Sequence, residues 1–145
     1  MTEQKDSLLA SELRTVVTRL IKKLRKQSST ADKLSLTERS IIALLDKHGE
    51  LLPNELAAME KITTQSMSQI LSKLQQMDLI KRRISETDKR KAIITLSDAG
   101  RELLYQVRSE RNEWLNKALE ATCTAEEKEL LKRAIGPLTK LVDFD

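Results

Sequence analysis

The stretch ITTQSMSQILSKLQQMDLI, residues 62–80, runs directly into KRRISETDKRKAIITL, residues 81–96, and together they decide the fold. In the first part, apolar residues recur at steps of three and four, which predicts a short amphipathic helix. The second part contains two β-prone runs, Leu79–Ile84 and Ala92–Leu96, joined by a polar turn at Ser85–Arg90. The sequence therefore predicts a helix followed by a charged β-hairpin.

A second short helix is predicted just before this one, over Pro53–Glu60, because Pro53 suits the first turn of a helix. Lys61-Ile62 forms a tight turn, and Thr63 or Thr64 caps the helix that follows. Two short helices joined in this way form a helix-turn-helix unit. With the hairpin as its wing, the chain is predicted to be mainly α with a small β-wing, a winged helix-turn-helix.

The polar face of the second helix lacks acidic residues until Asp78, although one third of the chain is charged. Its apolar stripe comprises Met67, Ile70, Leu71, Leu74 and Met77, and its other positions are mainly Gln and Ser. Glutamine pairs bidentately with adenine, and no carboxylate on this face repels phosphate. The face is typical of a surface that contacts base edges, although an ordinary solvated face would also be polar.

The net charge of +4 comes from 26 basic and 22 acidic residues, and its location is informative. Lys81–Lys91 holds six basic and two acidic residues, so this segment alone carries the whole excess. Such a cluster favours a polyanion-binding patch over a general contribution to solubility. We therefore predict that the chain binds double-stranded DNA.

Long amphipathic helices are predicted on both sides of this unit. Leu8–Lys26 has two adjacent apolar rows, Ser97 caps a helix that continues to about Ala121, and Thr124–Glu127 fits a capping box before a last apolar-faced helix. The first helix either packs in an ordinary core or forms a dimer interface, which would explain its two apolar rows.

Several other classes of protein are disfavoured by the composition. No run of 18 apolar residues and no signal peptide is present, which predicts a cytoplasmic protein without a membrane segment. His48 and Cys123 are the only His and Cys, so neither a metal site nor a cofactor is expected. A catalytic Ser-His-Asp set is not apparent either.

The motifs in order resemble the MarR family of bacterial and archaeal transcription regulators over nearly the whole chain. LQQMDLIKR at residues 74–82 resembles the end of the family's recognition helix. Asp88-Lys-Arg90 resembles its D-x-R wing, and Leu96-Ser-Asp-Ala-Gly100 resembles the L-[ST]-x-x-G start of the following helix. The order and spacing of the three motifs carry the resemblance.

The resemblance implies a homodimer with intertwined terminal helices, residues 1–30 and 99–145, and a DNA-binding region at residues 34–98. It also implies that Arg90 enters the minor groove while Asp88 orients its guanidinium, and that a small-molecule effector relieves repression at a pseudo-palindromic operator. The residues predicted to contact DNA are Thr64, Gln65, Ser66, Ser68, Gln69, Lys73, Lys81, Arg82, Arg83, Asp88, Lys89, Arg90 and Lys91.

Two positions depart from the family pattern. Asp78 stands where the family usually has Gly, and Asp tolerates a left-handed turn better than most residues do, so the turn is expected to survive. Gln69 stands where Arg is frequent, so the preferred base sequence is left open.

Two other functions compete with this interpretation. The first is a winged-helix module that binds protein or RNA without promoter recognition, which the charge of the hairpin and the acid-free helix disfavour. The second is an enzyme or redox sensor that uses Cys123, but its neighbours Glu120 and Glu126 do not favour a thiolate.

Overall fold

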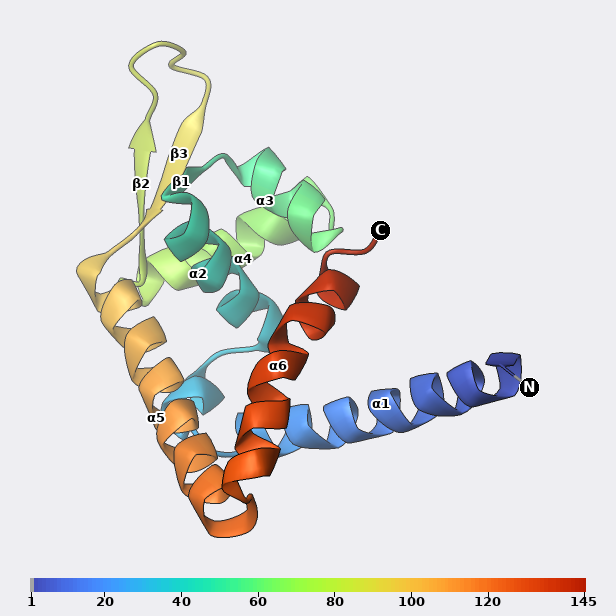
Figure 1. The fold of residues 1–145 in the computed structure, drawn as a ribbon. Helices are drawn as coiled ribbons and strands as arrows, with labels where there is room; N and C mark the ends of the chain where they lie inside the picture. The colour runs from blue at the N-terminus through green and yellow to red at the C-terminus, as the bar shows by residue number, and fades with distance from the viewer. Residues whose placement is uncertain (1) are drawn as a thin grey trace. The chain divides into compact units, whose positions relative to one another are not determined.

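The computed structural model describes residues 2–145 (Figure 1). Its elements, in chain order, are α1 (Thr2–Arg25), the 3-10 helix η1 (Thr30–Lys33), α2 (Leu36–His48), β1 (Glu50–Leu51), α3 (Pro53–Glu60), α4 (Thr64–Gln76), β2 (Ile80–Ile84), β3 (Ala92–Leu96), α5 (Asp98–Thr122) and α6 (Ala125–Val142). The predicted fold class, mainly α with a small β-wing, is confirmed.

The chain forms two compact units. One, the winged unit, is Ser28–Ser109, and the other, the helical unit, consists of Met1–Gln27 and Glu110–Asp145. The boundary falls inside α5. The proposed dimerisation and DNA-binding roles of these regions stay predictions.

The helix ends follow from side chains close to them in sequence. Ser35 and Glu38 form a capping box at the start of α2, in which each side chain accepts a hydrogen bond from the other residue's backbone N–H. Thr63 caps α4, and Gly49 ends α2 with a φ of 82°, a value that costs least for glycine. The Thr124–Glu127 capping box of α6 is also present.

The three strands form one antiparallel sheet in the order β1-β3-β2. β2 pairs with β3 in the register Ile80↔Leu96, Arg82↔Ile94 and Ile84↔Ala92, so these residues share one face of the sheet. β1 lies at Glu50–Leu51, and Leu51 pairs with Ile94.

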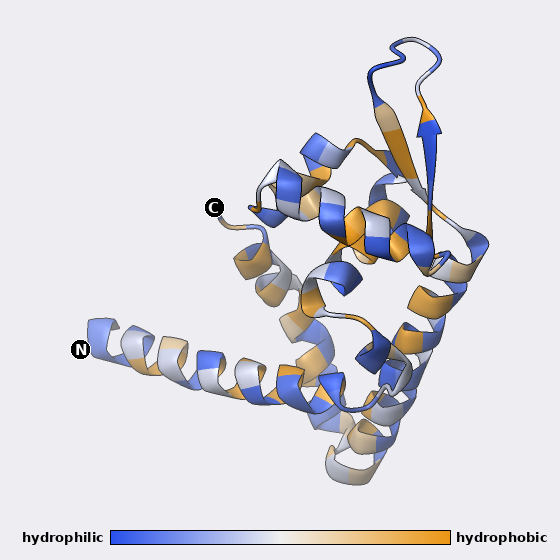
Figure 2. Ribbon diagram, turned by 180° about the vertical axis from the view of Figure 1, so that it is seen from behind, coloured by the Kyte–Doolittle hydropathy of each residue, from blue (hydrophilic) through white to orange (hydrophobic). Residues whose placement is uncertain are grey.

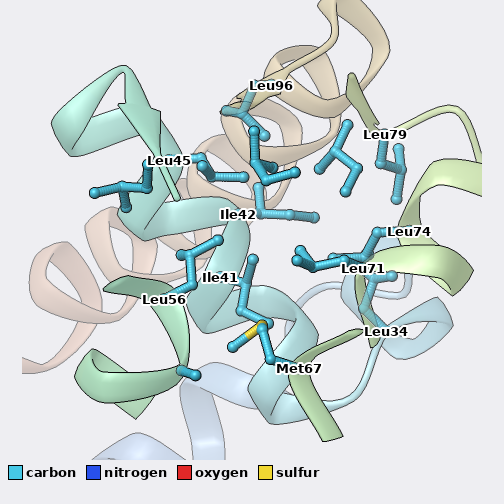
Figure 3. Close-up of a cluster of buried hydrophobic side chains, with 14 residues drawn as sticks. Leu34, Ile41, Ile42, Leu45, Leu56, Met67, Leu71, Leu74, Leu79 and Leu96 are labelled. Carbon is cyan, nitrogen blue, oxygen red and sulfur yellow. The ribbon is translucent and has the colours of Figure 1, made fainter. Parts of the chain in front are cut away.

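The core belongs to the winged unit. Ile41, Ile42 and Leu45 of α2 meet Met67, Leu71 and Leu74 of α4 in this cluster, and all six side chains are at most 1% exposed (Figure 3). Leu79 and Leu96 extend the cluster to the root of the hairpin. Burial of this apolar surface holds α4 against α2 and leaves its polar face outside. Met77, predicted to belong to the apolar stripe of α4, is instead 37% exposed, because it is the C-cap of the helix.

The helical unit is unlike the winged unit, because none of its described residues is fully buried. Apolar residues recur along α1 and α6 (Figure 2), yet Leu9 is 62% exposed and Ile135 61% exposed. The first helix, predicted to start at Leu8, is longer at its N-terminal end, because α1 begins at Thr2. Residues 2–145 contain no helix both long and apolar enough to cross a membrane.

Candidate nucleic-acid interface

The exposed face of α4 is the first part of the candidate interface. Because Met67, Leu71 and Leu74 point inward, the helical repeat places Gln65 and Gln69 on the opposite side. Thr63 Oγ1 accepts a hydrogen bond from Ser66 N at 3.1 Å and also bonds the Ser66 hydroxyl at 3.0 Å. The first turn of α4 contains no acidic residue, so its N-terminal dipole is available to a phosphate.

The residues predicted to contact DNA are accessible in the protomer. All of them are exposed except Asp88, which is half-buried. They gather on two elements of the same folded unit, the exposed face of α4 and the β2–β3 hairpin, which projects beyond α2, α3 and α4 in Figure 1. The structure therefore brings the predicted set onto one unit, and the contact of each residue with DNA stays a prediction.

The tip of the hairpin, residues 85–91, is held by its own polar groups. Ser85 N donates to Lys91 O at 2.9 Å, and Lys91 N donates to Asp88 O at 3.0 Å. The buried hydroxyl of Ser85 accepts from Asp88 N at 3.3 Å and also pairs with the Thr87 hydroxyl at 3.0 Å. These bonds give the basic tip a defined conformation.

Asp88 and Arg90 are in contact, as the D-x-R motif implied. Asp88 Oδ1 accepts from the backbone N–H of Arg90 at 3.1 Å and from its Nε at 3.3 Å. The backbone bond, followed by the side-chain bond, lowers the pKa of Asp88 from its ordinary 3.8. The Asp88 carboxylate is therefore charged at neutral pH and restrains a guanidinium whose side chain is 91% exposed.

The basic residues of β2 lie on two faces of the hairpin. Arg82 pairs with the buried Ile94, so it shares the face of the sheet that carries the core. Lys81 and Arg83 alternate onto the other face. There Arg83 Nη2 lies 2.6 Å from Glu50 Oε1 on β1. Lys81, Arg82 and Arg83 therefore do not form one continuous basic strip.

Ser97 and Gly100 fix the root of the hairpin. Ser97 Oγ donates to Asp78 O at 2.6 Å and accepts from Gly100 N at 2.9 Å, as the predicted cap of α5. Asp78 has a φ of 60°, so it adopts the positive φ expected where the family usually has Gly. These contacts explain why the L-S-x-x-G sequence follows the hairpin.

The sequence analysis did not predict two ion pairs that basic residues of the DNA-contacting set form with acidic residues. Glu38, which is buried, lies 3.3 Å from Lys73 Nζ, and Glu50 pairs with Arg83. No periodic signal links these residues, since each pair is more than 30 positions apart. Ser72 and Gln76 are exposed on the same side of α4 as Gln65 and Gln69, and the helical repeat could have added them to the candidates.

Among residues 2–145, no group of three or more His, Cys, Asp and Glu side chains is arranged to hold a metal ion. Cys123 is half-buried just after α5, with its sulfur 3.6 Å from the Thr122 hydroxyl.

The fold and the exposed surface of the winged unit define a winged helix-turn-helix protein. A family model described as MarR family matches residues 33–91. An uncharacterized HTH-type transcriptional regulator of Mycobacterium bovis, Mb0904, is 32% identical over 138 residues, which are 95% of this chain and 95% of the relative.

Solved structures agree with this assignment. A Pseudomonas aeruginosa protein described as a transcriptional regulator has a TM-score of 0.85 and 33% identity, covering 97% of this chain and 98% of that one. A mutant of S. aureus MepR bound to an oligodeoxyribonucleotide has the same fold, with a TM-score of 0.70 at 20% identity over 93% of this chain and 98% of its own. The chain belongs to the MarR family. It is therefore a DNA-binding transcription regulator and not an enzyme.

Proposed function

We propose that this regulator is a homodimeric repressor that binds a pseudo-palindromic operator and is released by a small-molecule effector. The observation that supports sequence-specific binding most directly is the acid-free, exposed face of α4. It lies in the same compact unit as the hairpin that carries the chain's excess positive charge. A groove-facing helix and a basic wing together supply base contacts and phosphate contacts.

The proposed contacts divide by chemistry. Gln65, Ser66, Ser68 and Gln69 contact base edges in the major groove, while Thr64 contacts a phosphate at the N-terminus of α4. Arg90 enters the minor groove, where a planar guanidinium suits the narrow, negative floor, and Asp88 orients it. The phosphate contacts from the wing are Lys81, Arg82, Arg83, Lys89 and Lys91.

The proposed partner of the helical unit is a second copy of this chain. Large exposed hydrophobic side chains concentrate there, on α1 and on α6 with the residues that follow it: Leu8, Leu9, Val16, Val17, Leu20, Ile21, Leu130, Leu131, Ile135, Leu141, Val142 and Phe144. Since this unit has no fully buried described residue of its own, covering these rows would stabilise it. A dimer would present two recognition helices, which requires an operator with two related half-sites.

Repression is proposed because a dimer seated on a promoter blocks the polymerase, and an effector would favour a dimer geometry that no longer matches the half-sites. A prokaryotic repressor of this kind acts in the cytoplasm, where the chromosome lies. Loss of the gene should raise expression from the promoter that the protein binds.

Footprinting of the upstream intergenic DNA tests the proposal. We expect protection of two related half-sites about one helical turn apart, overlapping a promoter. Equal affinity for that DNA and for a random duplex of the same length would refute sequence-specific recognition.

Substitutions then separate the two kinds of contact. Gln65→Ala and Gln69→Ala should each weaken operator binding by roughly 1–3 kcal/mol and relax the choice of particular base pairs. Gln75→Ala is the matched control, because Gln75 is exposed on the same helix but away from the outward face. Arg82→Ala should weaken binding to operator and random DNA alike and lower the salt slope by about one.

A further inference from the structure

Lys73 of α4 is the one residue of the predicted DNA-contacting set that lies against a buried acid. Its Nζ lies 3.3 Å from Oε1 of Glu38, in the first turn of α2. The Glu38 side chain is only 3% exposed, whereas that of Lys73 is 61% exposed. The pair therefore links α4, the proposed recognition helix, to α2, which packs against the inner face of α4.

The hydrogen bonds of Glu38 indicate why it needs Lys73. Its Oε1 also accepts from Ser35 N at 2.8 Å, which completes the capping box of α2. Its Oε2 is buried, and within residues 2–145 it has no hydrogen-bond partner. A buried carboxylate is costly without an opposite charge nearby, and Lys73 supplies that charge.

The place of Lys73 on α4 gives this contact a role in recognition. Lys73 follows Gln69 by four residues, so the two side chains are neighbours on the helix surface. A rotation of α4 about its axis would turn Gln69 relative to the base edges, and the same rotation would separate Lys73 from Glu38. The ion pair therefore restrains the setting of the base-contacting face.

We infer that Lys73 is a positioning residue, an inference that rests on the proposed function. Its ion pair with Glu38 sets the orientation of α4, and Lys73 does not neutralise a DNA phosphate. Lysines that neutralise phosphates release counterions and so contribute to the salt dependence of binding. Because Lys73 is already paired with Glu38, we expect it to contribute to the specificity of binding and not to the slope of log affinity against log salt concentration.

The experiment uses the full chain and the variants Lys73→Met, Glu38→Gln and their combination. Glutamine at the third position of a helix still completes a capping box, so Glu38→Gln removes the charge and keeps the cap. Glu127→Gln is the matched control, since Glu127 occupies the same position in the capping box of α6. Arg82→Ala serves as the reference for a lost phosphate contact. Affinities are measured for the operator and a random duplex at several salt concentrations.

Lys73→Met and Glu38→Gln should each weaken operator binding about tenfold, with random-duplex affinity and salt slope as in the unchanged protein. The double variant should lose no more than either single one, because both changes break the same contact. Glu127→Gln should bind normally. If Lys73→Met does not fold, the double variant takes its place in the same measurements, because it leaves no unpaired buried charge.

The inference would be overturned if Lys73→Met or the double variant lowered the salt slope of binding by about one and lost equal affinity for both duplexes. Lys73 would then be a phosphate contact. Normal operator binding by Glu38→Gln would overturn it as well. Failure of the proposed function looks different, because the unchanged protein would then prefer no upstream duplex. The slope of Lys73→Met on random DNA would still decide whether Lys73 neutralises a phosphate.

Discussion

Gly100 faces the carbonyl oxygen of Leu79 so closely that a Cβ at this position would lie 2.1 Å from that oxygen and 3.2 Å from Leu96 Cδ2. The first of these contacts is with backbone, which cannot swing aside as a side-chain end does. The start of α5 therefore sits directly against the root of the hairpin, and only glycine leaves room for it.

Gly100→Ala is expected to lower the free energy of unfolding by about 2 kcal/mol or more, because the hairpin root must move away from α5. Urea denaturation followed by circular dichroism measures this loss. Gly136→Ala is the control, since a Cβ at that position meets nothing within 4 Å, and its effect should stay within about 1 kcal/mol. Similar urea midpoints for both variants would contradict the close approach.

Asp78 and Lys61 are the described non-glycine residues with positive φ, at 60° and 55°. Asp78→Gly should stabilise the protein by less than about 1 kcal/mol, because an Asp side chain tolerates this conformation. Lys61→Gly should stabilise it more, since lysine lacks that tolerance. Chemical denaturation of the two variants checks this order, and a larger gain for Asp78→Gly would be inconsistent with it.

Arg90→Ala should cause the largest loss of operator binding among single changes in the wing, roughly 1–3 kcal/mol. Arg90→Lys should restore only part of it, since lysine keeps the charge but lacks the planar fork. Binding isotherms on one operator fragment at several salt concentrations provide the measurement.

Substitution of Asp88 distinguishes two explanations of how the wing binds DNA. Asp88→Ala removes a negative charge near DNA, so simple electrostatics predicts tighter binding. If Asp88 orients Arg90 through the bonds at 3.1 and 3.3 Å, binding should weaken instead. Asp88→Asn should lose less, because its side-chain oxygen still accepts from Arg90 N. Tighter binding by Asp88→Ala would leave the wing as a plain charge patch.

The stability of the winged unit should depend on pH through Glu38. Burial raises the pKa of this carboxyl group, but the bonds from Ser35 and the charge of Lys73 lower it by more, so it lies below the ordinary 4.5. The stabilisation that follows is complete above about pH 4.5 and is lost as the pH falls through the lowered folded pKa. The free-energy difference between the unchanged protein and Glu38→Gln should therefore shrink below that pH. Urea unfolding at pH 3 to 7 measures it, and a constant difference would exclude this linkage.

Sedimentation should find a dimer at micromolar concentration. Ile135→Glu should dissociate it, because a charge would be buried among the apolar rows of α6. Ile84→Glu is the matched control: Ile84 is 66% exposed on the wing, compared with 61% for Ile135. If Ile135→Glu sediments as the unchanged protein does, another surface must form the interface.

Much of the secondary structure could be predicted from local patterns. The Thr124–Glu127 capping box, the helix at Pro53–Glu60 and the strand at Ala92–Leu96 are confirmed. Each depends on hydrogen bonds or side-chain repeats within a few residues, so the sequence alone contains the relevant signal. The early start of α1 was missed because residues 2–7 are polar and helical periodicity is read from apolar residues.

The sequence by itself determined the order of elements, the acid-free face of α4, the concentration of charge at Lys81–Lys91 and the family. Only the tertiary structure decided that Lys73 pairs with Glu38 and Arg83 with Glu50, and that no described side chain of the helical unit is fully buried. Composition and periodicity describe neighbours along the chain. Ion pairs between residues more than 30 positions apart arise only when core packing brings their helices or strands together.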